Sequence, residues 1–182
     1  MGDASVQKSK EITDYLEQHL GQQIGNGECY TTVDEALTNA GLKSARDFGK
    51  ITPTADYVWG RKVEAKEVRA GDAIQFSSYR VTIVTVTRED EPDGSWSENT
   101  QTETYERPHH SAVVQTLPSE TGPMTVYESN VNGSRDVQSN QLYMQSVPKT
   151  KTTTGGDGET KVTVTRTVTV TGKIKFYRPQ TP

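Results

Sequence analysis

The residues from 25 to 30 read Gly25-Asn26-Gly27-Glu28-Cys29-Tyr30, a glycine-rich turn that leads into the only cysteine of the 182-residue chain. From Cys29 to Ala40 the apolar residues recur at helical spacing, which predicts a helix capped by Asn26 or Gly27. We therefore expect Cys29 in the first turn, where free N–H groups and the helix dipole stabilise a thiolate. A cysteine that serves packing alone is more typical of a mid-helix apolar position, so this placement favours a reactive thiol.

A base for this thiol has to come from another element of the fold. The segment Pro108-His109-His110-Ser111-Ala112-Val113-Val114 supplies two histidines on a predicted strand. Adjacent strand residues point to opposite faces, so only one of the two histidines faces the cysteine. His110 shares its parity with Ala112 and Val114, which could line a buried face, and we therefore choose His110 and expect His109 to point away.

A third group is needed to orient the imidazole. The next predicted strand, Val126-Tyr127-Glu128-Ser129-Asn130-Val131, offers Glu128 and Asn130, which are two residues apart and are expected on one face. Burying a carboxylate and an amide without partners is costly, and orienting His110 gives both a partner. The alternative is a solvent-facing edge strand, on which the pair has no role.

Helical patterns come first in the chain and strands follow, which predicts an α+β fold. The first helix is expected to begin at an Asp3 cap and to end near Leu20. We expect one domain, residues 1–182, with two long β-hairpin insertions at 88–107 and 148–172. The segments that read as strands are 73–87, 100–105, 110–116, 125–131, 143–147, 162–170 and 174–177.

The composition excludes several classes of function. A net charge of −4 and dispersed Lys and Arg argue against nucleic-acid and anionic-membrane partners. The apolar runs are too short to span a bilayer, and the chain opens without a secretory leader, so the cytosol is the default expectation. A lone cysteine excludes an intramolecular disulfide, and consecutive strand histidines diverge, so we expect no metal site from His109, His110 and Glu128 and no cofactor.

Four motifs occur in the order found in CHAP domains: the turn Gly25–Tyr30, the Gly-Asp strand start within 70–76, the stretch His110–Val114, and Glu128–Gly133. Over roughly residues 20–180 the chain thus resembles the CHAP/NlpC-type papain-like cysteine amidohydrolases and peptidases. The resemblance implies N-terminal helices packed on an antiparallel sheet. It also implies Cys29 as nucleophile, His110 as base, and Glu128 or Asn130 as the orienting residue.

The chemistry implied by the resemblance is hydrolysis of an amide bond through a thioester, with a peptide-like or cell-wall peptide substrate. Transfer of the acyl group to an amine, or deamidation, would use the same residues. The other interpretation is an inactive module of the same fold that docks a protein partner, or a second copy of itself, through its β-hairpins.

Overall fold

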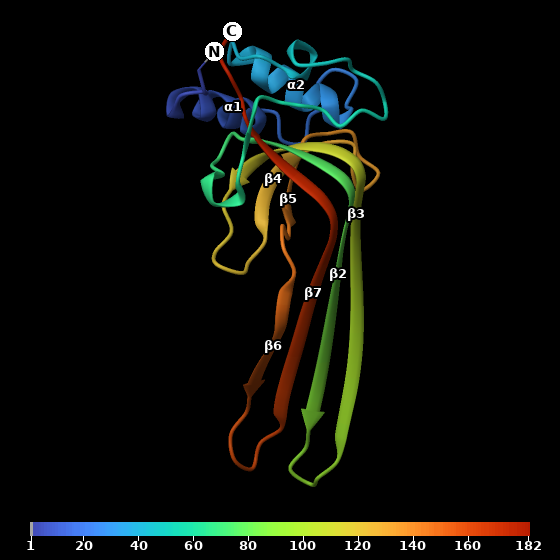
Figure 1. Cartoon of the computed structure of the whole chain (residues 1–182). Helices are drawn as coiled ribbons and strands as arrows, with labels where there is room; N and C mark the ends of the chain where they lie inside the picture. Colours follow the sequence, from blue (N-terminus) through green and yellow to red (C-terminus); the bar gives the residue numbers. More distant parts are fainter. Residues whose placement is uncertain (1) are drawn as a thin grey trace. The chain divides into compact units, whose positions relative to one another are not determined.

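The computed structural model describes residues 2–182, and within them α1 and α2 precede all of the strands (Figure 1). The sheet has the strand order β1-β7-β2-β3-β4-β5, with β6 paired to β7, and the β1–β7, β3–β4, β4–β5 and β6–β7 pairs are antiparallel. The predicted α+β class is confirmed. The elements are α1 (Val6–Gln18), α2 (Cys29–Asn39), η1 (Ala45–Asp47), β1 (Arg61–Val63), η2 (Ala65–Glu67), β2 (Ala73–Asp90), β3 (Trp96–Thr116), β4 (Met124–Glu128), β5 (Gln138–Leu142), β6 (Val147–Thr154) and β7 (Lys161–Arg178).

The chain divides into two compact units, and the long strands β2, β3 and β7 contribute residues to both. Unit 1 comprises the residues up to Tyr79, residues 107–142 and residues 172–182, and unit 2 comprises residues 80–106 and 143–171. β2 joins β3 through residues 91–95, and β6 joins β7 through residues 155–160, inside the ranges predicted as hairpins. The two strands predicted at 100–105 and 110–116 form one continuous strand of 21 residues.

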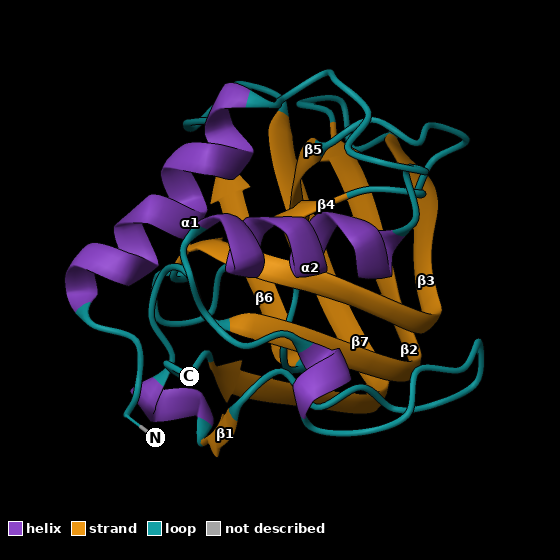
Figure 2. Ribbon diagram, turned by 90° about the horizontal axis from the view of Figure 1, so that it is seen from above, coloured by secondary structure: helices purple, strands orange, loops and turns teal. Residues whose placement is uncertain are grey.

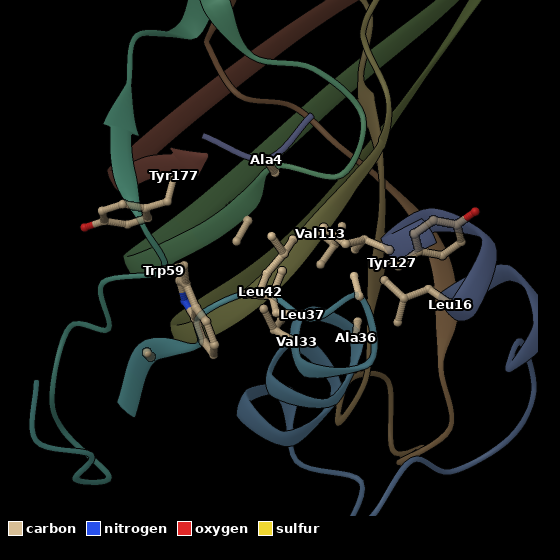
Figure 3. Close-up of a cluster of buried hydrophobic side chains, with 14 of the residues drawn as sticks. Ala4, Leu16, Val33, Ala36, Leu37, Leu42, Trp59, Val113, Tyr127 and Tyr177 are labelled. Carbon is tan, nitrogen blue, oxygen red and sulfur yellow. The ribbon is translucent and has the colours of Figure 1, made fainter. Parts of the chain in front are cut away.

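The core of unit 1 lies between the two helices and the sheet. α1 and α2 lie side by side on the same side of this unit (Figure 2). Their apolar faces pack against Val113 of β3 and Tyr127 of β4, and Trp59 is fully buried in the same cluster (Figure 3). Burying one large aliphatic side chain contributes about 1.5–3 kcal/mol, so this cluster fixes α2 on the sheet. The helical residues in the cluster are Ile12, Leu16, Val33, Ala36 and Leu37.

Unit 2 is the part of the sheet in which the order is β6-β7-β2-β3. Among its described residues the buried hydrophobic side chains are Val81, Ile83, Val147 and Val168. Residues 96–106 of the outer strand β3 are exposed throughout, and threonines recur along the exposed part of β6. Unit 2 therefore gains its order mainly from the hydrogen-bonded ladder of the sheet.

Several predicted boundaries are wrong, each for a local reason. Ser5, whose hydroxyl accepts a hydrogen bond from the Lys8 N–H, caps α1, while the Asp3 carboxylate pairs with Arg61 instead. Glu28 precedes α2 as its cap in place of Asn26 or Gly27. The strand predicted at 143–147 is displaced, because residues 138–142 pair with β4 as β5. Within residues 2–182, no helix combines the length and the apolar character that a bilayer crossing requires.

Candidate active site

The turn before Cys29 can be formed only by glycine at two positions. Gly25 and Gly27 have φ of 53° and 74°, in the left-handed region that other residues rarely adopt. A Cβ atom on Gly25 would lie 2.6 Å from the Thr31 side chain, and one on Gly27 would lie 2.5 Å from Arg135 Cβ. These two glycines therefore allow the chain to turn tightly enough for Cys29 to begin α2.

Hydrogen bonds from side chains hold the turn in place, and no described side chain before Cys29 caps the N-terminus of α2. Asn26 Oδ1 accepts hydrogen bonds from the Glu28 N–H at 3.1 Å and from Thr31 Oγ1 at 2.7 Å. The Glu28 side chain makes no capping bond to α2. The Tyr30 N–H instead bonds to the sulfur of Cys29, and this bond at the head of the helix helps to lower the pKa of the thiol.

His110 of β3 is buried and forms a hydrogen bond with the half-buried Cys29 thiol. Its Nε2 lies 2.9 Å from Oε2 of Glu128, which leaves Nδ1 as the ring nitrogen that faces the thiol. Burial would raise the pKa of Cys29, but the hydrogen bond to His110, the charge of that imidazole and the N–H groups of Ser111 and Tyr30 outweigh it. The pKa of the thiol is therefore lowered.

The pKa of His110 moves in the opposite direction. Burial would lower it, but the bonds to Cys29 and to Glu128, and the negative charge of each, favour the protonated ring and raise it. A lowered thiol pKa and a raised imidazole pKa shift this pair toward thiolate and imidazolium. This is the state in which a cysteine is nucleophilic at neutral pH.

Glu128, the last residue of β4, is fully buried and its carboxylate has several donors. Arg107 donates from Nε to Oε2 at 2.8 Å and from Nη2 to Oε1 at 2.5 Å, and Asn140 Nδ2 donates to Oε1 at 2.9 Å. Burial would raise the pKa of Glu128, but Arg107 and His110 outweigh it and lower the pKa to about 2. The carboxylate therefore stays ionised beside the imidazole.

Asn130 does not contact His110, and the prediction that it shares a strand face with Glu128 is wrong. β4 ends at Glu128, and Asn130 has φ of 57°, so the strand alternation stops between the two residues. The exposed side chain of Asn130 donates to Glu28 Oε2 at 2.8 Å. The structure thus pairs Glu128 with His110 and places Asn130 beside the residue that precedes Cys29.

The segment after β4 fastens α2 to the sheet at three places. Ser129 Oγ lies 2.6 Å from Thr32 Oγ1 in the interior, and Asn130 bonds to Glu28. Arg135 forms an ion pair with Glu28 at 3.3 Å and donates to the Asn26 carbonyl at 3.1 Å. Glu128 and the residues that follow it therefore position both the base and the head of the nucleophile's helix.

The other histidines lie outside this arrangement. His109 Nε2 lies 2.5 Å from the Ala55 carbonyl oxygen and its ring meets the edge of Tyr57, so its hydrogen bond is made outside the pair of Cys29 and His110. His19 Nδ1 lies 2.7 Å from the Tyr15 carbonyl oxygen. Within the described part of the chain, no group of three or more His, Cys, Asp or Glu residues is arranged to hold a metal ion.

Sequence reasoning missed two kinds of residue around the site. Arg107 and Asn140 complete the shell of Glu128, although neither lies in a motif. Gln75 is fully buried, and its Oε1 accepts bonds from Ser111 Oγ at 2.8 Å and Trp59 Nε1 at 3.3 Å, which steadies the backbone beside the thiol. The signal for Gln75 was a lone amide inside an apolar run, since a buried amide requires partners.

Comparison with known proteins gives one match. The family model of the AIM3/BBC1 cysteine proteinase-fold domain matches residues 1–150. No curated protein and no solved structure matches the chain significantly. The description of the family confirms the papain-like, cysteine-proteinase type of fold, and the assignment to the CHAP/NlpC type stays a prediction. Since the match covers most of the chain, the protein belongs to the AIM3/BBC1 cysteine proteinase-fold domain family.

Proposed function

We propose that this chain is a cysteine amidohydrolase of the CHAP/NlpC kind, in which Cys29 attacks the carbonyl carbon of a peptide-like amide. One observation carries the proposal. A thiol at the head of a helix is hydrogen-bonded to a buried imidazole, and the far nitrogen of that imidazole lies 2.9 Å from a buried carboxylate. This is the order nucleophile, base and orienting group that acyl transfer by a thiol requires.

The steps follow from this order. His110 Nδ1 takes the proton of the thiol, and the sulfur forms a bond to the amide carbon. The negative charge moves to the carbonyl oxygen, where the Cys29 N–H at the helix head is placed to donate to it. The C–N bond breaks, and the amine leaves with the proton from His110. A water molecule then gives its proton to His110 and releases the acid from the thioester.

The substrate class is proposed from two sources. The description of the family as a cysteine proteinase fold favours a peptide bond or a similar amide. The resemblance of the motifs to CHAP domains favours peptide substrates that include those of cell walls. Transfer of the acyl group to an amine would use the same residues and would differ only in the molecule that attacks the thioester.

Alkylation of the thiol at pH 6 tests the proposal without a known substrate. We expect iodoacetamide to modify Cys29 several-fold faster than free cysteine at this pH, because a larger fraction of the thiol is ionised. In the His110→Gln variant the advantage is lost, and in His109→Gln it is kept because the hydrogen bond of that ring goes to the Ala55 carbonyl oxygen. A wild-type rate no greater than that of free cysteine would remove the nucleophile from the mechanism.

The outer edge of β3 favours a second candidate function, docking of another copy of the chain by strand addition. β3 pairs with β4 only between Val113 and Thr116, so along residues 96–106 the side away from β2 carries no described strand. This edge has Glu98, Glu103 and Glu106, the last of them paired with Arg80, and no Lys or Arg, whereas the opposite outer strand β6 has Lys149 and Lys151 and no acid. β6 and β3 are the outer strands of unit 2, so the β6 edge of one copy can extend the β3 edge of the next.

Reversing the charges on the two edges distinguishes specific pairing of β3 with β6 from nonspecific association. The variants Glu98→Lys/Glu103→Lys and Lys149→Glu/Lys151→Glu should each be monomeric by light scattering at low salt. Mixing the two should restore association, because the β3 edge of each variant is then opposite in charge to the β6 edge of the other. A mixture that stays monomeric while wild type associates would exclude pairing of these two edges, and a monomeric wild type would exclude the docking itself.

A further inference from the structure

We propose that Arg107 is a positioning residue that fixes the carboxylate of Glu128 and, by sharing its negative charge, limits how strongly Glu128 holds the imidazole of His110. This inference rests on the proposed function, because it assigns a role within the same site. Arg107 binds the carboxylate of Glu128, and Glu128 contacts the imidazole of His110, so the effect on Cys29 proposed here passes through these two residues.

The geometry of the pair is that of a fixed fork. Arg107 donates from Nε and Nη2 to the two oxygens of Glu128, and the two side chains are only 7% and 0% exposed. Asn140 Nδ2 adds a third donor on Oε1. A planar guanidinium bound to both oxygens sets the plane of the carboxylate, which a lysine ammonium cannot do.

The contact between Glu128 and His110 shares an oxygen with this fork. Nε2 of His110 lies 2.9 Å from Oε2. The same Oε2 accepts the bond from Arg107 Nε. The carboxylate thus divides its negative charge between the guanidinium of Arg107 and the imidazole of His110.

The charged and titratable groups around His110 come from four elements. Cys29 faces it from α2, Glu128 from β4 and Arg107 from its own strand β3, while Tyr79 of β2 lies close enough to Arg107 and Glu128 to interact with their charges. In this set Arg107 is the one group with a fixed positive charge. Removing it leaves a buried carboxylate whose remaining cationic partner is a protonated His110, so Glu128 would draw the proton onto the ring more strongly.

The test measures the titration of His110 by NMR, with no substrate present. In Arg107→Met we expect the pKa of His110 to rise by about half a unit or more, because its carboxylate is no longer shared. In Arg107→Lys the charge is kept and the pKa should stay near that of wild type, but the alkylation rate of Cys29 should fall several-fold because the fork is lost. Arg80→Met is the matched control, since Arg80 forms an exposed ion pair with Glu106 at 3.2 Å.

Arg107→Met leaves a buried charge and can unfold the protein, so the double variant Arg107→Met/Glu128→Gln accompanies it. The neutral amide removes the charge that Arg107 balances, and we expect a folded protein whose His110 pKa lies below that of wild type. An unchanged pKa of His110 in Arg107→Met would overturn the role of Arg107, and if that variant unfolds, a Cys29 alkylation rate in Arg107→Lys equal to that of wild type would overturn it. Failure of the proposed function looks different, because Cys29 would then alkylate no faster than free cysteine while these pKa shifts persisted.

Discussion

The hydroxyl oxygens of Thr32 and Ser129 lie 2.6 Å apart in the interior, and this contact joins one turn of α2 to the residue that follows Glu128. The helix that begins with Cys29 is therefore bonded to the residue next to Glu128, and Glu128 contacts His110. The distance from the thiol to the imidazole thus depends on a bond between two residues that take no part in the chemistry.

Removing one of these two hydroxyls should lower the free energy of unfolding more than removing both. Thr32→Val leaves the buried Ser129 hydroxyl without its partner, which costs about 1–3 kcal/mol of unfolding free energy. In Thr32→Val/Ser129→Ala the loss should be smaller, because no buried polar atom lacks a partner. Urea unfolding measures the difference, and Thr38→Val on the exposed face of α2 is the control. A double variant less stable than the single one would contradict the interpretation.

The lowered pKa of Cys29 and the raised pKa of His110 both increase the fraction of the pair that exists as thiolate and imidazolium. We expect the alkylation rate to rise at lower pH than it does for free cysteine, and the His110→Gln variant to shift the curve to higher pH. Rates measured with iodoacetamide from pH 4 to 10 give both curves, and curves that coincide for the two proteins would contradict the ion pair.

Glu128 should make the folded protein sensitive to acid. Its pKa is about 2 in the folded state, against about 4.3 in an unfolded chain. Because the folded pKa is the lower one, the carboxylate stabilises the fold above pH ~4.3, and this contribution is lost as the pH falls toward 2. The loss is about 3 kcal/mol at most.

Unfolding free energies at pH 7, 4 and 3 check this prediction. Wild type should lose stability across the interval, while Glu128→Gln should be less stable at pH 7 and should lose less on acidification. Glu98→Gln, which changes an exposed carboxylate, should follow wild type. Equal acid sensitivity of wild type and Glu128→Gln would mean that other carboxylates dominate.

Glu128 and Asn130 should give opposite results in the same assays. Glu128→Gln removes the charge beside His110, so the pKa of that imidazole should fall toward its ordinary value. Asn130→Ala should leave that pKa unchanged, because the amide bonds to Glu28. NMR titration of the ring separates the two, and a shift in Asn130→Ala as large as in Glu128→Gln would contradict this division of roles.

The parts of the site that could be predicted depend on local patterns. The glycine turn and the helical spacing after it placed Cys29 at a helix head, and strand parity selected His110 over His109. Both inferences need only a few consecutive residues. The prediction for Asn130 failed because it assumed that the strand continued past Glu128, where the chain takes a left-handed conformation.

Arg107 could not be predicted by the same reasoning. It has the parity of His109, not of His110, and its partner is 21 residues away in the chain. The pairing depends on how β3 and β4 meet, and no short pattern contains that information. The two strands expected at 100–105 and 110–116 are one for a related reason, because the ladder continues through residues between them that look polar and loop-like.

The glycines before Cys29 separate two kinds of evolutionary constraint. Gly25 and Gly27 are required by the backbone and by the close approach of Thr31 and Arg135, whether or not a thiol follows. Cys29 is required only if the chain performs chemistry. A homologue that retained both glycines but replaced the cysteine would keep the fold and lose the nucleophile, as a pseudoenzyme does. The residues at these three positions therefore distinguish homologues in which the nucleophile is under selection from those in which only the fold is.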